Sequence, residues 1–192
     1  MPESEPRTGI RELRADERGA FRGPLADLLL DAVAGGASVS FMADLDHETA
    51  LRFWDGVFDR VAEGRAHLFA AERQGEVLGT VQLLTGTPPN QPHRAEIAKM
   101  LVRRDARRAG LGRALMQAAE QRAARLGRWL IVLDTVPGTP GERLYRSLGY
   151  VEVGRIPDYA LWPDGRLCDT VLFYKRLNGA RLERRRPGRH DA

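Results

Sequence analysis

The sequence predicts an α/β protein with one mixed sheet of about seven strands, flanked by about four helices. Three observations lead to this fold class. Strand-like and helix-like segments alternate along the chain, and the unbroken apolar run from Trp129 to Asp134 is typical of a strand buried on both faces. A strand–helix–strand unit ends in that run, which predicts a parallel pair of strands with a right-handed crossover.

The N-terminal elements follow from local patterns. Residues 10–15 alternate apolar and polar side chains, as a short strand does. A helix is expected from Pro24 to Val33, ended by the glycine pair 35–36. A second helix should run from Glu48 to Glu63, because its apolar residues recur every three or four positions and Asp46 is a natural N-cap.

The central elements form the predicted parallel unit. Strands and one helix are expected at residues 66–73, 77–84, 95–102 and 111–126. Gln74-Gly75 should join the first two strands as a hairpin. The helix then connects the strand ending at Val102 to the apolar run, which makes those two strands neighbours.

The C-terminal elements are one helix and two strands. The helix carries Leu144 and Tyr145 and should end at Gly149. The strands, at residues 150–160 and 167–177, flank Pro163-Asp-Gly165, which is turn chemistry.

Charge and length predict how the chain is divided. From Lys175 onward there are seven basic and two acidic residues, a net charge of +5, which leaves −1 for the preceding part of a chain whose total is +4. We expect a flexible N-terminus at 1–8, one domain at 9–177 and a disordered basic tail at 178–192. The tail has no recognition motif beside it, so we expect no nucleic-acid partner.

Other classes of protein are disfavoured by what the sequence lacks. No stretch approaches the roughly 20 apolar residues that cross a bilayer, and the N-terminus has no secretion-signal pattern. Cys168 is the only cysteine, so we expect neither an internal disulfide nor a thiolate metal site. These features favour a cytoplasmic protein without a membrane or metal partner.

The segment that follows the strand ending at Val102 suits a phosphate. A helix start presents backbone N–H groups without intrahelical partners, and glycines let a phosphate approach them. The candidate binding residues are Arg107, Arg108, Ala109, Gly110, Leu111, Gly112 and Arg113. Neither the nucleoside-triphosphate loop pattern nor the dinucleotide pattern is present.

These residues resemble a known family. Arg107-x-x-Gly110-x-Gly112 resembles the Q/R-x-x-G-x-G/A pattern of the GCN5-related N-acetyltransferases (GNAT), and the segment from Leu144 to Tyr150 is similar to their L-Y-x-x-x-G-F pattern. The resemblance extends over residues 9–177. It implies the GNAT-type sheet, acetyl-CoA as cosubstrate, and acetyl transfer to a primary amine by direct attack.

The resemblance implies the roles of Glu96 and Tyr145, whereas the role of Asp134 follows from its place at the carboxyl end of the apolar strand, where ligand crevices open. Glu96 is the expected general base and Asp134 a second base or substrate anchor, with a strand-end carboxylate and a turn cap as the respective alternatives. Tyr145 is the expected acid for the leaving thiolate and a second contact to acetyl-CoA, with a core aromatic as the alternative. Leu101 and Val102 should pair with the pantetheine arm through their backbones, as an added strand would.

Two short segments bear on the acceptor. Asp134-Thr-Val and Asp158-Tyr159 look like the tabtoxin-resistance type of acetyltransferase, which implies a small antibiotic- or toxin-like amino compound. A protein N-terminus or lysine is the main alternative, and a non-catalytic acetyl-CoA-binding regulator is another. A homodimer is among the oligomeric states left open.

Overall fold

In the described part of the chain, the sheet contains seven strands in the order β1-β2-β3-β4-β5-β7-β6, of which only β4 and β5 are parallel neighbours. The computed structural model describes residues 8–177. The strands are β1 Gly9–Leu13, β2 Ala66–Arg73, β3 Glu76–Leu84, β4 Arg94–Val102, β5 Leu130–Thr135, β6 Val151–Leu161 and β7 Leu167–Arg176. The helices are α1 Arg18–Ala34, α2 His47–Ala62, α3 Leu111–Arg125 and α4 Pro140–Ser147, with short 3-10 turns at Ala15–Glu17 and Arg104–Ala106. The predicted fold class is confirmed.

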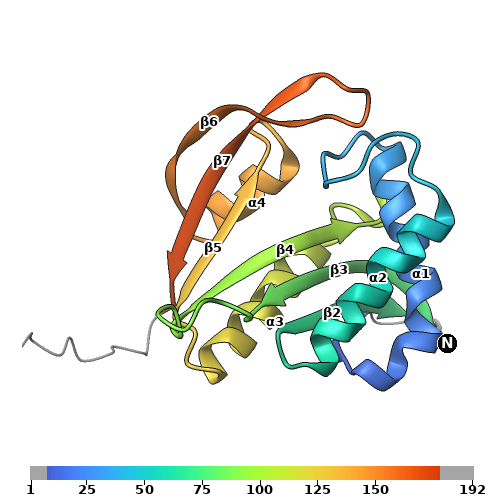
Figure 1. The fold of residues 1–192 in the computed structure, drawn as a ribbon, viewed down its shortest axis with the longest axis horizontal. Helices are drawn as coiled ribbons and strands as arrows, with labels where there is room; N and C mark the ends of the chain where they lie inside the picture. The colour runs from blue at the N-terminus through green and yellow to red at the C-terminus, as the bar shows by residue number, and fades with distance from the viewer. Residues whose placement is uncertain (1–7, 178–192) are drawn as a thin grey trace, which may run out of the picture.

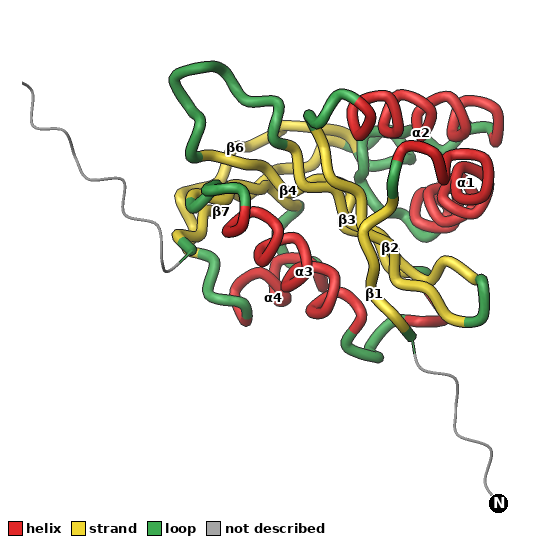
Figure 2. Tube along the Cα trace, turned by 90° about the horizontal axis from the view of Figure 1, so that it is seen from below, coloured by secondary structure: helices red, strands yellow, loops and turns green. Residues whose placement is uncertain are grey.

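The helices cover the two faces of the sheet in pairs. α1 and α2 lie on one face and α3 and α4 on the other, as Figure 2 makes visible. Leu25, Trp54 and Phe58 are fully buried in the core under α1 and α2. Leu115 and Ile131 belong to a second core under α3 and α4. The predicted tail 178–192 lies outside the described residues. The same holds for the predicted N-terminal segment 1–8, apart from its last residue, Thr8.

The start of α1 differs from the prediction. The helix begins at Arg18, and Pro24 lies inside it rather than at its start. A proline inside a helix removes one backbone hydrogen bond and strains the preceding turn. Phe21 and Leu25, one on each side of Pro24, are both buried, and this burial offsets the cost.

The burial of β5 also differs from the prediction. Ile131 and Leu133 are buried, whereas Leu130 and Val132 are half-buried and Asp134 is exposed. The strand is therefore covered on one face only. The reason is that α1 and α2 pack over β2, β3 and β4, so the same face of β5 is left open.

The parallel pair separates after a short contact. Residues 94–96 of β4 pair with residues 130–132 of β5. Beyond this point β4 continues beside β3 and β5 continues beside β7, and Figure 1 shows the two strands diverging. β4 also contains a bulge: Ala98 pairs with Gln82 but Leu101 with Thr80, and Lys99 between them has a φ of 47°. The opening between β4 and β5 is a gap in an otherwise continuous sheet.

The β6–β7 hairpin reaches across the molecule to the α1–α2 connection (Figure 1). The backbone N–H of Ala43 donates to the carbonyl of Pro163 at 3.0 Å. The hydroxyl of Ser38 donates to the carbonyl of Leu161 at 2.8 Å. These bonds join the two sides of the molecule that flank the strand opening.

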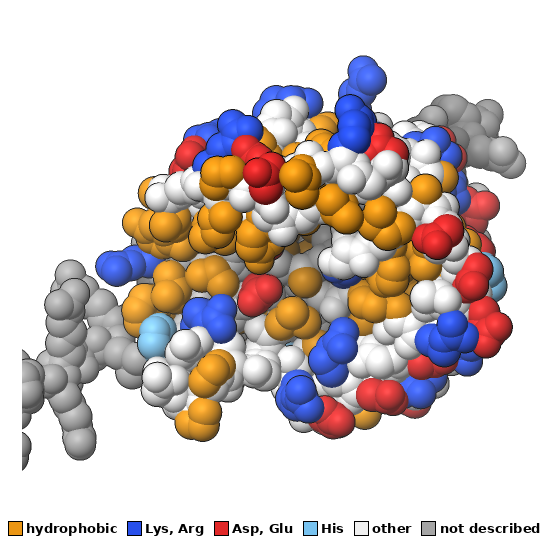
Figure 3. All heavy atoms as spheres, turned by 45° about the horizontal axis from the view of Figure 1, so that its top comes forward, with side chains coloured by type: hydrophobic (Ala, Val, Ile, Leu, Met, Phe, Trp, Pro, Cys, Tyr) orange, Lys and Arg blue, Asp and Glu red, His pale blue; other side chains and the backbone are white. Residues whose placement is uncertain are grey.

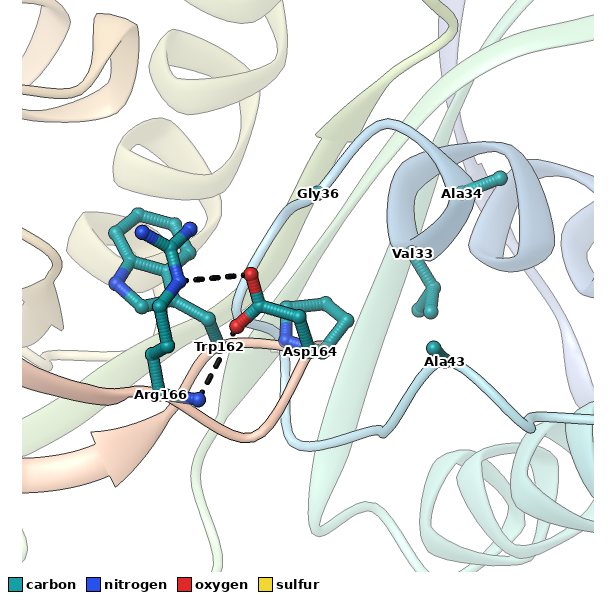
Figure 4. Close-up of a pocket in the computed structure, with 8 residues that line it drawn as sticks. Val33, Ala34, Gly36, Ala43, Trp162, Asp164 and Arg166 are labelled. Atoms are coloured by element: carbon teal, nitrogen blue, oxygen red, sulfur yellow. Dashed lines mark hydrogen bonds and ion pairs between the residues drawn. The ribbon is translucent and has the colours of Figure 1, made fainter.

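A cavity of about 280 Å³ lies where the hairpin meets the end of α1 (Figure 4). Val33 and Ala43 line one side, and Pro163 and the ion pair between Asp164 and Arg166 line the other. None of the predicted site residues lines this cavity. Among residues 8–177, no helix combines the length and apolar character that a membrane span requires.

Candidate active site

The loop before α3 presents unpaired backbone donors. Gly110 precedes the helix with a φ of 77°, and Arg108 has a φ of 65°. The first hydrogen bond of α3 runs from Ala114 N–H to the Gly110 carbonyl at 3.1 Å. Within the described part of the chain, no oxygen accepts from the N–H groups of residues 108–113. Such a cluster of donors at a helix start fits a pyrophosphate, so the residues present suit acetyl-CoA.

The arginines of this loop differ in their contacts. Arg113 reaches α4, where its Nη2 donates to Ser147 Oγ at 2.9 Å. Arg107 turns back, and its Nε donates to the carbonyl of Val102 at 3.3 Å. Arg108 and Ala109 are exposed, whereas the side chain of Leu111 is buried in the core. Arg107 therefore holds the loop against the end of β4, and Arg108 and Arg113 supply charge around the donors.

Gly112 has a packing role that the sequence reading did not include. A Cβ at this position would lie 3.0 Å from Leu144 Cδ2 and 3.7 Å from Met100 Sδ. Distances below about 3.4 Å are tighter than ordinary van der Waals contacts. The glycine thus allows α3 and α4 to approach each other, and α4 carries Tyr145.

Tyr145 lies on α4 with 6% of its surface exposed. Its ring contacts that of Tyr150 edge-on, with centroids 5.9 Å apart. Burial raises the pKa of its hydroxyl well above the usual value, and the negative charge of Asp134 raises it further. The hydroxyl is therefore protonated at neutral pH and available as a proton donor.

The two predicted carboxylates lie on the strands that diverge. Glu96 is the last residue of β4 that pairs with β5, 44% of its side chain is exposed, and its Oε2 lies 3.6 Å from Arg94 Nη1. Asp134 lies near the end of β5, where its Oδ2 accepts from Thr170 Oγ1 at 2.7 Å. Asp134 does not cap the next helix, because the N-cap of α4 is Thr139.

Both carboxylates face the open side of the sheet. Their neighbours Ile97 and Leu133 point into the core under α3 and α4, and alternate residues of a strand point to opposite faces. Figure 3 shows the molecule hollowed on this side, with hydrophobic and charged side chains around the hollow.

The backbones of Leu101 and Val102 lie along the opening. They pair with Thr80 and Gly79 of β3 on one side, and on the other side β5 has already moved away. The side chain of Leu101 is buried in the core under α1 and α2. An extended ligand arm can therefore pair with this edge of β4 without displacing a strand.

Lys99 is a residue of this site that the sequence reading missed. It lies at the β4 bulge, and its Nζ donates to Ser40 Oγ at 3.1 Å. Burial lowers the pKa of Lys99, while the charges of Asp134 and Glu96 act in the opposite direction. A charged residue inside the apolar run from Ile97 to Val102 was the available signal in the sequence.

Comparison with known proteins agrees with this geometry. The model of the acetyltransferase (GNAT) family matches residues 14–150. A ribosomal-protein-alanine N-acetyltransferase from Brucella melitensis is similar in structure, with a TM-score of 0.71, 23% identity, and coverage of 88% of this chain and 99% of that one. The putative acetyltransferase yncA from Salmonella typhimurium, solved with its cofactor acetyl-CoA, gives a TM-score of 0.72 at 20% identity, covering 90% and 95%. A putative phosphinothricin N-acetyltransferase gives 0.73 at 20% identity, covering 90% and 100%.

The chain therefore belongs to the GNAT family of acetyltransferases. It is an acetyl-CoA-dependent enzyme, as predicted from the glycine loop and the tyrosine helix.

Proposed function

We propose that this enzyme acetylates the primary amine of a small molecule by direct attack, as the tabtoxin-resistance type of acetyltransferase does. The observation that carries the proposal is the arrangement around the opening of the sheet. Glu96, Asp134 and Tyr145 come from β4, β5 and α4, and the β6–β7 hairpin is bonded to the α1–α2 connection on the same side of the molecule.

The cofactor end of the site is assigned to the loop and to the β4 edge. The N–H groups of residues 108–113, with Arg108 and Arg113, would hold the pyrophosphate, while the backbones of Leu101 and Val102 would pair with the pantetheine arm. When bound there, acetyl-CoA supplies the acetyl group as an activated thioester.

The proton transfers are assigned to two side chains. An amine is mostly protonated at neutral pH, so Glu96 would accept the proton that the acceptor loses, directly or through water. Asp134 would anchor the amine near Glu96, because its position on β5 is fixed by Thr170. Tyr145 would donate its hydroxyl proton to the departing thiolate, a role that its raised pKa supports by keeping it protonated.

The hairpin favours a small acceptor over a protein. Two hydrogen bonds, from Ala43 to Pro163 and from Ser38 to Leu161, close the space between the hairpin and the α1–α2 connection. A folded protein surface would have to displace these bonds to reach the carboxylates, whereas we expect that a free amino compound would not. This supports a small molecule rather than a protein N-terminus or lysine.

The edge strand β6 supports the homodimer. Val151, Val153, Tyr159 and Leu161 are all at least 42% exposed on it. Exposed apolar residues on an edge strand are a common basis for pairing between chains. The cytoplasmic location favoured by the single cysteine stays a prediction.

The test is thiol release from acetyl-CoA across a panel of small amines, amino compounds and peptides with free N-termini. The proposal requires turnover of at least one small amine, with the acetylated amine identified by mass spectrometry. Turnover restricted to peptides or proteins would contradict it. CoA binding without turnover of any acceptor would favour the non-catalytic regulator.

A further inference from the structure

Lysine is rare in this protein. The chain contains 28 arginines and two lysines, Lys99 and Lys175. Lysine differs from arginine in carrying its charge on one compact ammonium with three donors, which suits a confined position. The surroundings of these two lysines are therefore compared.

The two lysines differ in their partners. Lys175 forms a conventional ion pair, with its Nζ 2.7 Å from Glu120 Oε2. Lys99 is also partly buried, but within residues 8–177 no carboxylate lies within 4.0 Å of its Nζ. Its hydrogen-bond partner is the Ser40 hydroxyl, which satisfies one of the three ammonium donors. The Lys99 ammonium is therefore partly buried, and among the described residues it has neither a partner for its other two donors nor an anionic partner.

The surroundings of Lys99 point its ammonium toward the acceptor side of the sheet. It contacts Ser40 from the α1–α2 connection and lies 5.7 Å from the ring centroid of Phe53 on α2. The charges of Glu96 and Asp134, both on the open face, act on it. Lys99 therefore lies on the same side of the sheet as the two carboxylates.

A second cation lies on the same side of α2 as Phe53. Arg60 follows Phe53 by seven residues, which places both on one face of that helix, and its charge also acts on Lys99. The buried Nε of Arg60 has no hydrogen-bond partner in the described part of the chain. An anion in this region would be attracted by two positive groups that have donors to spare.

The backbone at this contact is also unusual. Lys99 and Ser40, which bond to each other, both have positive φ angles, 47° and 74°. Such conformations are costly for residues other than glycine and concentrate at binding and catalytic sites. The bulge of β4 re-aims Lys99 out of the strand's alternation, as bulges next to active sites do.

We propose that Lys99 binds a carboxylate of the acceptor, which makes the acceptor an amino acid or a close analogue. The inference rests on the proposed small-molecule function and narrows it. The site then complements a zwitterion, because the acceptor's amine lies between Glu96 and Asp134 while its carboxylate lies at Lys99.

The test uses acceptors in matched sets. Each set contains an amino acid, its primary amide and its decarboxylated amine, drawn from α-, β- and γ-amino acids. Thiol release gives kcat/KM, and titration of the same compounds into CoA-loaded enzyme gives binding without turnover. Comparing a variant with the wild type on one compound cancels the intrinsic reactivity of that amine.

The expected result is a loss confined to the carboxylated member. Lys99→Met should lower kcat/KM and affinity for the amino acid by about tenfold or more, as expected for a hydrogen bond to a charged group. The amide and the decarboxylated amine should change by less than about twofold, because neither presents a carboxylate to Lys99. Lys99→Arg should keep part of the preference, and unchanged CoA affinity shows that each variant is folded.

Two control variants separate carboxylate binding from a structural role. Ser40→Ala removes the hydrogen bond to Lys99 but keeps the ammonium, so the preference for the carboxylate should persist. Arg52→Met removes one exposed positive charge on α2, where Arg52 pairs with Glu48, and should change nothing.

The outcomes distinguish the two proposals. An equal loss of kcat/KM on all three members in Lys99→Met would overturn the inference and leave Lys99 as a support for the α1–α2 connection. Turnover of amides and amines without any carboxylated acceptor would also overturn it, while the small-molecule function would stand. Turnover of peptides alone, with no binding of any amino acid, would remove both.

Discussion

Replacing Tyr145 by phenylalanine removes only a hydroxyl and keeps the ring. The ring packs against Tyr150 and into the core under α3 and α4, and the Tyr145 hydroxyl forms no hydrogen bond with another described residue. We therefore expect the free energy of unfolding to change by less than about 1 kcal/mol. The affinity for CoA should also stay close to the wild-type value, because the loop at residues 108–113 is untouched.

Turnover should fall by a much larger factor in Tyr145→Phe. A positioned general acid contributes about a hundredfold to ten-thousandfold, which corresponds to about 3–5 kcal/mol of activation free energy. Thiol release under single-turnover conditions measures this step, and thermal unfolding with CoA titration serves as the control.

The pH dependence of the wild type gives a second check on Tyr145. Because burial and Asp134 raise the pKa of the hydroxyl, it stays protonated below pH 10, so it should not produce an alkaline loss of kcat in that range. Because the pKa is raised in the folded state only, the tyrosine of the unfolded chain ionises first. The free energy of unfolding therefore falls as pH rises above the ordinary tyrosine pKa of about 10. A wild-type single-turnover rate in the folded phenylalanine variant would refute the assignment and leave Tyr145 with a packing role only.

The carboxylates, the glycine loop and the tail can be tested in the same assay. Glu96→Gln should turn over slowly near pH 7, and its turnover should recover as pH approaches the pKa of the acceptor amine. Asp134→Asn should mainly raise KM. Alkaline recovery in Asp134→Asn alone would make Asp134 the base. Gly112→Val should weaken CoA binding by about tenfold or more in calorimetry and lower Tm, because its Cβ would press on α4. Gly154→Val, where nothing lies within 4 Å, is the matched control, and equal effects at both positions would argue against a special role for Gly112. Removal of residues 178–192 should leave turnover unchanged, and its loss in a folded protein would contradict the domain boundary at 177.

The elements that the sequence predicted well are those determined by local chemistry. Asp46 caps α2, accepting from the Thr49 N–H at 2.6 Å, and the β2–β3 turn has positive φ at Gln74 and Gly75. The loop before α3 was also predicted, because a left-handed Gly110 at a helix start is encoded in a few adjacent residues. In each case the residues that determine the structure are neighbours in the chain.

The features that were missed depend on residues far apart in the chain. The β4 bulge at Lys99 exists only in the register between β3 and β4, which no single segment encodes. The open face of β5 depends on where α1 and α2 pack, and the hairpin bridge on contacts between Ser38 and Leu161. Sequence patterns thus predicted local turns and helix starts better than contacts between distant segments.

The short contact between β4 and β5 has a consequence for how the protein folds. Strands β1–β4 and strands β5–β7 each come from one continuous stretch of chain, and all pairs within these two groups are antiparallel. The hairpin pairs β2–β3, β3–β4 and β6–β7 close short loops and form fast, whereas the β4–β5 pair, like β1–β2 and β5–β7, joins residues far apart in the chain. We expect the hairpins to form first and the two groups to join late, because only residues 94–96 and 130–132 connect them. The seam between the two groups also borders the edge of β4 along which the pantetheine arm is proposed to lie.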